Sequence, residues 1–93
     1  MDRITTILEE VFAQNIDWCA SYEGDLIGCA SIYSHQCINI WVSKNKAMVM
    51  FINPTPYKDD LTRTMREYIS CFYLYPNVEQ VKKIKNRLVI KFR

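Results

Sequence analysis

Apolar residues recur every three or four positions in two segments of the chain, which is the period of an α-helix. The first segment covers residues 2–14, and its apolar positions are Ile4, Ile7, Leu8, Val11 and Phe12. The second follows the proline-containing stretch NPTPYK, and its apolar positions are Leu61, Met65, Tyr68, Ile69 and Phe72. The pattern therefore predicts two amphipathic helices, the second of which ends before Pro76 because a residue preceding proline resists the helical conformation.

Between these helices the pattern changes to alternation, which is the period of a β-strand. Residues 16–22 alternate, Glu-Gly-Asp interrupts them at 23–25, and apolar residues resume at 26–32. This order predicts a hairpin with a three-residue loop at 23–25. That loop would place Trp18 opposite Ala30 and Cys19 opposite Cys29.

A second hairpin is predicted from CINIWVS (37–43) and AMVMFI (47–52), joined by Lys-Asn-Lys. Its first strand would direct Ile38, Ile40 and Val42 to the core and Trp41 to the other face. Its second strand is apolar at every position, so it is either buried on both sides or exposes an apolar row.

The final residues alternate again, with Leu88, Ile90 and Phe92 on one side and Val89, Lys91 and Arg93 on the other. Residues 78–84 fit either a strand or a short helix. Short connections favour antiparallel pairing, so residues 1–93 are expected to form one α+β domain. We predict a mainly antiparallel sheet of four to six strands with both helices on one face.

Composition narrows the class of protein. Apolar residues make up 49% and charged residues 24% of a 93-residue chain, which is sufficient for one hydrophobic core. With only two glycines, Gly24 and Gly28, the loops are expected to avoid tight turns that need positive φ. The first residues do not resemble a secretory signal and no apolar run could span a membrane, so a cytoplasmic protein is expected. The four cysteines are then predicted to be reduced thiols packed as small apolar side chains: Cys19, Cys29, Cys37 and Cys71.

Charge is unevenly distributed along the chain. Residues 1–81 hold six basic and ten acidic groups, a net of −4, whereas residues 82–93 hold six basic groups and no acid, a net of +6. The cations singled out as candidate binding residues are Lys82, Lys83, Lys85 and Arg87. They could protect a sheet edge, bind nucleic-acid phosphates or contact an acidic protein surface.

A second apolar sheet face is the other candidate site. Depending on register, Met48 with Met50 or Val49 with Phe51 would join a patch formed by Ile27, Cys29, Tyr33 and Trp41. Exposed patches of this kind usually mark binding surfaces. Three alternatives stay open: the protein's own C-terminal segment or second helix covers this face, a second copy covers it, or a foreign partner does.

Catalytic chemistry finds little support in the sequence. The single histidine, His35, adjoins Ser34, but neighbouring side chains in an extended segment point apart. The chain carries no Walker loop, nucleophile elbow or HExxH motif. Cys19, Cys29, His35 and Cys37 lack the close spacing of a zinc knuckle. We therefore expect no enzyme, cofactor or metal, and keep a small metal-dependent or hydrolytic enzyme around His35 as the least favoured alternative.

The sequence is best interpreted as a protein-interaction module, an inhibitor or adaptor. Trp41, Tyr33 and Ile27 would supply the main contacts, and the basic C-terminal residues would steer the module toward an acidic surface. The first alternative is nucleic-acid binding by the same cations. In overall composition the chain is similar to accessory proteins of phages and other mobile elements, and that resemblance implies a protein that binds and blocks a host protein.

Overall fold

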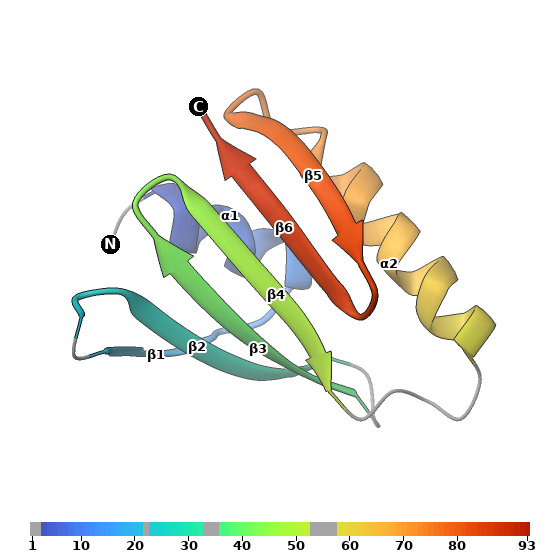
Figure 1. Ribbon diagram of the computed structural model, residues 1–93, viewed down its shortest axis with the longest axis horizontal. Helices are drawn as coiled ribbons and strands as arrows, with labels where there is room; N and C mark the ends of the chain where they lie inside the picture. The colour runs from blue at the N-terminus through green and yellow to red at the C-terminus, as the bar shows by residue number, and fades with distance from the viewer. Residues whose placement is uncertain (1–2, 22, 33–35, 53–57) are drawn as a thin grey trace.

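The computed structural model describes residues 3–21, 23–32, 36–52 and 58–93, which form two helices, the first followed by four strands and the second by two (Figure 1). In chain order the elements are α1 (Arg3–Phe12), β1 (Asp17–Ala20), β2 (Leu26–Ile32), β3 (Gln36–Ser43), β4 (Lys46–Ile52), α2 (Lys58–Phe72), β5 (Val78–Ile84) and β6 (Arg87–Phe92). Residues 78–84, for which the sequence predicted either a strand or a short helix, form strand β5. Helix α2 ends before Pro76, as predicted.

The six strands form one sheet in the order β1-β2-β3-β4-β6-β5, and every neighbouring pair is antiparallel. Strands β1 to β4 follow one another as a meander. Helix α2 then carries the chain past the position of β6 to the outer strand β5, and β6 returns between β4 and β5. The predicted α+β class with a mainly antiparallel sheet is confirmed.

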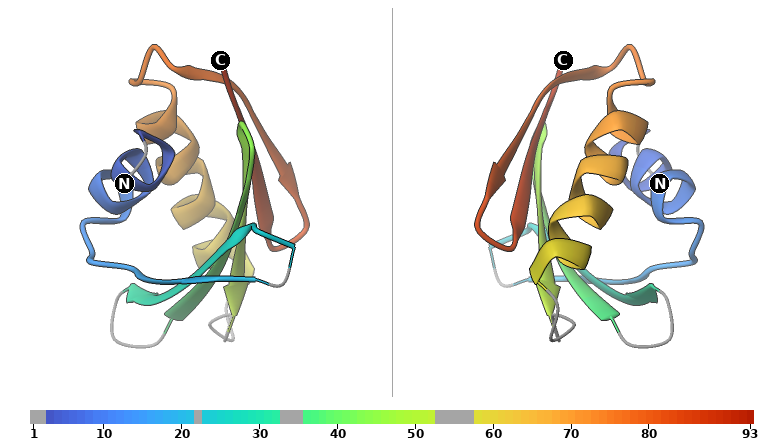
Figure 2. Two further views of the ribbon diagram at one scale, coloured as in Figure 1. Left: turned by 90° about the vertical axis from the view of Figure 1, so that its left-hand side faces the viewer. Right: turned by 90° about the vertical axis from the view of Figure 1, so that its right-hand side faces the viewer.

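Both helices lie on the same side of the sheet, as the two side views show (Figure 2). Burial alternates along β4 and β6, where every second side chain is buried. The predicted inward residues Ile38, Ile40 and Val42 of β3 are all buried. The hydrophobic core therefore lies between the helices and one face of the sheet.

Aromatic rings fill the centre of this core. The ring centroid of Phe12 in α1 lies 4.6 Å from that of Tyr68 and 5.9 Å from that of Phe72, both in α2. It also lies 6.4 Å from the ring of Phe51 in β4. These separations are within the range in which aromatic pairs attract one another, so this cluster joins both helices to the sheet.

The first hairpin has a different register from the one predicted. Trp18 lies opposite Gly28, and Cys19 lies opposite Ile27 rather than Cys29. The loop lies between Ser21 and Asp25, where the Ser21 amide donates to the Asp25 carbonyl at 2.7 Å. Three-residue hairpin loops end in a left-handed residue, and Gly24 takes that place with φ +88. The glycine therefore sets the loop one residue earlier, which shifts the pairing by two residues.

Two hairpin turns contradict the expectation that a glycine-poor chain avoids positive φ. Lys44 and Lys85 have φ of 54 and 55, each as the first residue of a two-residue loop. The strain of such a residue is on the order of 1 kcal/mol. The following asparagines offset it, because the carbonyls of Asn45 and Asn86 accept amide hydrogen bonds at 2.8 and 2.9 Å from the neighbouring strand.

Candidate functional site

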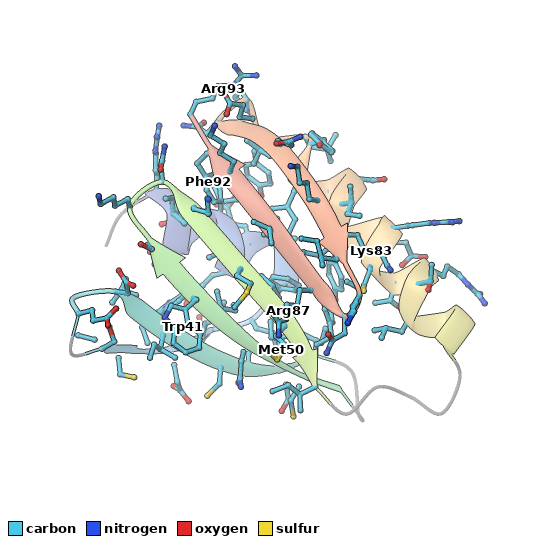
Figure 3. All side chains as sticks on the ribbon, in the orientation of Figure 1. Trp41, Met50, Lys83, Arg87, Phe92 and Arg93 are labelled. Carbon is cyan, nitrogen blue, oxygen red and sulfur yellow. The ribbon has the colours of Figure 1, made fainter. Side chains whose placement is uncertain are left out.

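The sheet face opposite the helices carries large side chains that no described segment covers, and Figure 3 views the molecule from that side. The C-terminal residues and α2, which the sequence allowed as covers, lie elsewhere: the former extend the sheet as β5 and β6, and α2 packs on the other face. We call this surface the open face. Its central side chains are those of Cys19, Ile27, Cys29, Asn39, Trp41, Met48, Met50, Lys82, Arg87 and Val89.

One row of cross-strand partners crosses the whole open face. Its members, from β1 to β5, are Cys19, Ile27, Trp41, Met48, Val89 and Lys82. Partners directly opposite each other share a face and contact one another. Trp41 is 44% exposed although it lies near the middle of this row. The register thus places Met48 and Met50 beside Trp41, while Val49 and Phe51 lie in the core.

A second row runs beside the first. Its members are Asp17, Cys29, Asn39, Met50, Arg87 and Ile84, and the Ile84 side chain is 52% exposed. The predicted packing of the thiols is wrong for Cys19 and Cys29, because both are exposed on this face. Cys19 belongs to the edge strand β1, and Cys29 lies on the adjacent strand β2, where no described segment covers this face of the sheet.

Four cations lie on one half of the open face, over β4, β6 and β5. Lys82 belongs to the first row and Arg87 to the second, and Lys46 lies opposite Lys91 beside the first row, on the side away from the second. The Lys91 ammonium lies 3.2 Å from the Glu79 carboxylate, but both side chains are about half exposed, so the pair contributes little to stability. Lys46 and Lys91 are not among the predicted binding residues, although the alternation along β6 already placed Lys91 opposite the core side.

The four cations predicted as binding residues are divided by the fold. Lys82 and Arg87 lie on the open face with Trp41 and Ile27. Lys83 lies opposite the buried Leu88 and thus projects toward the helix side, while Lys85 lies in the β5–β6 turn. A bulge between Val78 and Gln80 precedes this part of β5. Tyr33 lies outside the described residues, as does His35.

Arg93 serves the fold rather than the open face. Its Nε donates to the Pro76 carbonyl at 3.1 Å, and its amide donates to the Asn77 carbonyl at 2.7 Å. The guanidinium of Arg3 in turn donates to the Arg93 carbonyl. The last residue is therefore joined to both the start of α1 and the connection between α2 and β5.

The outer edge of β5 is occupied by a side chain. The Val81 amide donates to the Tyr73 hydroxyl at 2.8 Å, and that hydroxyl lies 3.4 Å from the Val81 carbonyl. A sheet edge with unpaired backbone groups invites pairing with another strand. Tyr73 therefore blocks strand addition at the middle of β5.

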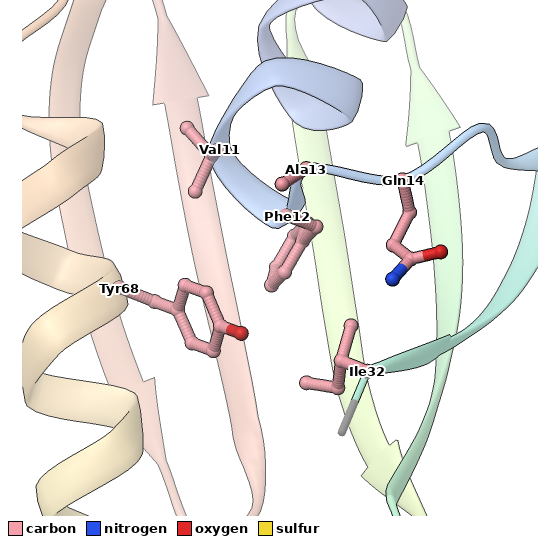
Figure 4. Close-up of a pocket in the computed structure, with 6 residues that line it drawn as sticks. All are labelled: Val11, Phe12, Ala13, Gln14, Ile32 and Tyr68. Carbon is pink, nitrogen blue, oxygen red and sulfur yellow. The ribbon is translucent and has the colours of Figure 1, made fainter. Parts of the chain in front are cut away.

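A recess also lies on the helix side, between the end of α1, α2 and β2 (Figure 4). Its volume is about 320 Å³, at the lower end of the range for small-molecule sites. The lining residues are Val11, Phe12, Ala13, Gln14, Ile32 and Tyr68. Three of these side chains belong to the core, and only Gln14 and Tyr68 carry a polar side-chain group, so the recess offers few groups that could orient a ligand.

Within the described residues, no group of three or more His, Cys, Asp or Glu side chains is arranged to hold a metal ion. None of the described helices is both long and apolar enough to cross a membrane. Comparison of the chain with protein-family models, curated proteins and solved structures finds no match. The open face is therefore the best-supported candidate site on physical grounds.

Proposed function

We propose that this protein is a protein-binding module that acts as an inhibitor or adaptor, and that the open face receives its partner. The observation that carries the proposal is the exposed indole of Trp41, 44% accessible within an apolar row between Ile27 and Met48. Tryptophan is one of the residues enriched at the energetic centres of interfaces, where surrounding contacts exclude water. The resemblance in composition to phage accessory proteins favours an inhibitor.

A reducing compartment suits this proposal. All four cysteines are free thiols, and Cys19 and Cys29 are exposed on the open face itself. Exposed thiols persist in the cytoplasm, where disulfides are rare, and we propose that the protein acts there. A second copy of the chain is an alternative occupant of the face.

The experiment that tests the proposal is partner capture from nuclease-treated lysate with the tagged protein and two variants. Trp41→Ala should abolish capture and leave the far-UV circular dichroism unchanged. Leu74→Ala is the matched control, because Leu74 is also an exposed large apolar residue, 81% accessible, but lies outside the sheet. If Trp41→Ala does not fold, Met48→Ala tests the same row.

Equal capture by wild type and Trp41→Ala would remove the support for this site.

The runner-up function is nucleic-acid binding, which is favoured by the position of Lys82 and Arg87 on the same face as Trp41. It predicts that log K falls linearly with log salt, and that losing these two cations lowers the slope by roughly 1 to 2. An affinity for oligonucleotides that does not change with salt would rule it out.

A further inference from the structure

We infer that the partner segment received by the open face is an acidic amphipathic helix. This inference rests on the function proposed above and adds the chemistry of the partner to it. Three observations on the described residues carry it: the charge of the face, the type of its apolar side chains and the state of the sheet edges.

The charge of the open face selects an acidic partner. Four cations lie on it, and the acidic groups that share or reach it are Asp17, Glu79 and Asp25, which continues the alternation of β2 one residue before the strand, so its net charge is +4 − 3 = +1. All four cations lie over β4, β6 and β5, on one side of Trp41. A second copy would bring another face with the same cationic excess against the first, whereas carboxylates above this half would meet Lys46, Lys82, Arg87 and Lys91.

The apolar side chains select a protein rather than a nucleic acid. Ile27, Met48 and Val89 are aliphatic or thioether side chains, which pack against the side chains of a protein partner. Bases instead stack on aromatic rings, and single-strand binders present several of them. Among the described residues of the open face, Trp41 is the only aromatic one.

The sheet edges select a helix rather than an added strand. Tyr73 occupies the outward backbone groups of Val81 at the β5 edge, and the opposite edge strand β1 has only four residues. The other face of this sheet already packs against two helices. Strand β4, with seven residues, extends roughly 20 Å, which matches about 13 residues of helix.

The test is selection from a library of random peptides of about 16 residues, long enough for four helical turns. Peptides displayed on phage are selected on the wild-type protein and depleted on Trp41→Ala. We expect the remaining sequences to combine Asp and Glu with apolar residues spaced by three and four. Their affinity should fall about tenfold in the double variant Lys82→Glu/Arg87→Glu, since two lost ion pairs of roughly 0.7 kcal/mol each give that factor.

The matched control is Lys83→Glu/Lys85→Glu, which makes the same change in net charge away from the open face. It should alter affinity by less than about twofold, because salt largely screens the interaction between exposed charges that are far apart. Trp41-dependent peptides that are neutral or basic, that alternate like a strand, or that respond equally to both double variants would overturn the inference while leaving the proposed function standing.

Two further outcomes also overturn the inference. The first is a Trp41-dependent dimer in sedimentation of the purified protein, which would assign the face to a second copy. The second is Trp41-dependent binding of labelled oligouridylate or oligothymidylate, which would assign it to nucleic acid. If the library gives no peptide that depends on Trp41, the proposed function itself fails.

Discussion

Gly28 lies in β2 directly opposite Trp18, and the indole takes the space that a side chain would fill. A Cβ atom built on Gly28 would lie 2.6 Å from Cγ2 of Ile16 and 2.8 Å from two ring carbons of Trp18. Contacts this short require one of the neighbours to move. The position is thus fixed by packing, since the backbone of Gly28 does not have a positive φ.

We predict that Gly28→Ala lowers the free energy of unfolding by about 1 to 3 kcal/mol, the usual cost of overfilling a packed site. Urea denaturation followed by circular dichroism measures this difference. Cys29→Ala is the control, because Cys29 is the next residue of the strand and is exposed, and it should change stability by less than about 0.5 kcal/mol. Equal stability of Gly28→Ala and wild type would show that the indole is not held above the glycine.

The hydroxyl of Tyr75 donates to a carboxylate oxygen of Glu10 at 2.8 Å and links α1 to the segment after α2. This hydrogen bond raises the pKa of Tyr75 above the ordinary value of 10.0. The folded state therefore holds the phenol proton more tightly than the unfolded state does. The stabilisation is fully present below about pH 10 and is lost as the pH rises through the higher folded pKa.

We expect Tyr75→Phe to be less stable than wild type at neutral pH and to approach it as the pH rises above about 10, because the variant lacks this titration. Urea denaturation of both proteins from about pH 8 to about pH 11 checks it. In Glu10→Gln, phenolate absorbance should show the Tyr75 pKa returning toward its ordinary value. A stability difference between Tyr75→Phe and wild type that is constant over this range would contradict the prediction.

At the scale of elements, β4 and β6 have similar sequences, and the strand order of the sheet shows that they are also neighbours. The segments KNKAMVMF and KNRLVIKF begin with equivalent Lys-Asn turns and lie antiparallel as neighbours. Asn45 accepts a hydrogen bond from the Phe92 amide, and Asn86 accepts one from the Phe51 amide. Each turn thus binds the end of the other strand, which explains why the strained Lys44 and Lys85 are tolerated in these turns.

We predict that Tyr73→Phe opens the outer edge of β5. The variant loses the hydroxyl that bonds Val81, so the free energy of unfolding should fall by about 1 kcal/mol. Unpaired backbone at an edge strand also favours pairing between chains. Sedimentation should then show association that grows with concentration in Tyr73→Phe and is weaker in wild type. Unchanged stability and an unchanged sedimentation profile would mean that the phenol does not protect this edge.

At the scale of the whole molecule, periodicity predicted both helices, the α+β class and the inward side of β3, because burial on one side leaves a regular apolar pattern. The predicted register of β1 and β2 was wrong because the register depends on which position of the loop Gly24 occupies, and Gly24 takes the left-handed last position. Exposure of the open face could not be predicted, since a strand as apolar as β4 is equally compatible with burial on both sides. That outcome was decided by the C-terminal residues, which extend the sheet as β5 and β6, while both helices pack on the other face as predicted.

The face of the sheet to which each C-terminal cation projects could likewise not be predicted from the sequence pattern. Lys82 and Lys83 are neighbours in the chain, but pairing with Val89 and Leu88 sends them to opposite faces. A run of basic residues thus becomes a polarised surface only through strand pairing. The consequence is an electrostatic field that is positive over one half of the open face and can be measured without any partner.

Quenching of Trp41 fluorescence by ions provides that measurement. In a Trp18→Phe variant Trp41 is the only tryptophan, and its exposed indole lies on the same face as Arg87 (Figure 3) and, by strand pairing, Lys82. Iodide should quench it more than caesium does at low salt, after normalisation to neutral acrylamide, because cations concentrate anions nearby. The preference should shrink at about 1 M salt, where charges are screened within roughly 3 Å.

Charge reversal tests whether Lys82 and Arg87 cause the preference of Trp41 for iodide. In the same Trp18→Phe background, Lys82→Glu/Arg87→Glu should remove or invert the preference of Trp41 for iodide. Lys83→Glu/Lys85→Glu should largely retain it, because Lys83 projects toward the helix side and Lys85 lies in the turn. Since both double variants change the net charge by the same amount, an equal response would mean that the quenchers sense total charge. A difference between them would show that strand pairing, rather than composition, makes the open face cationic.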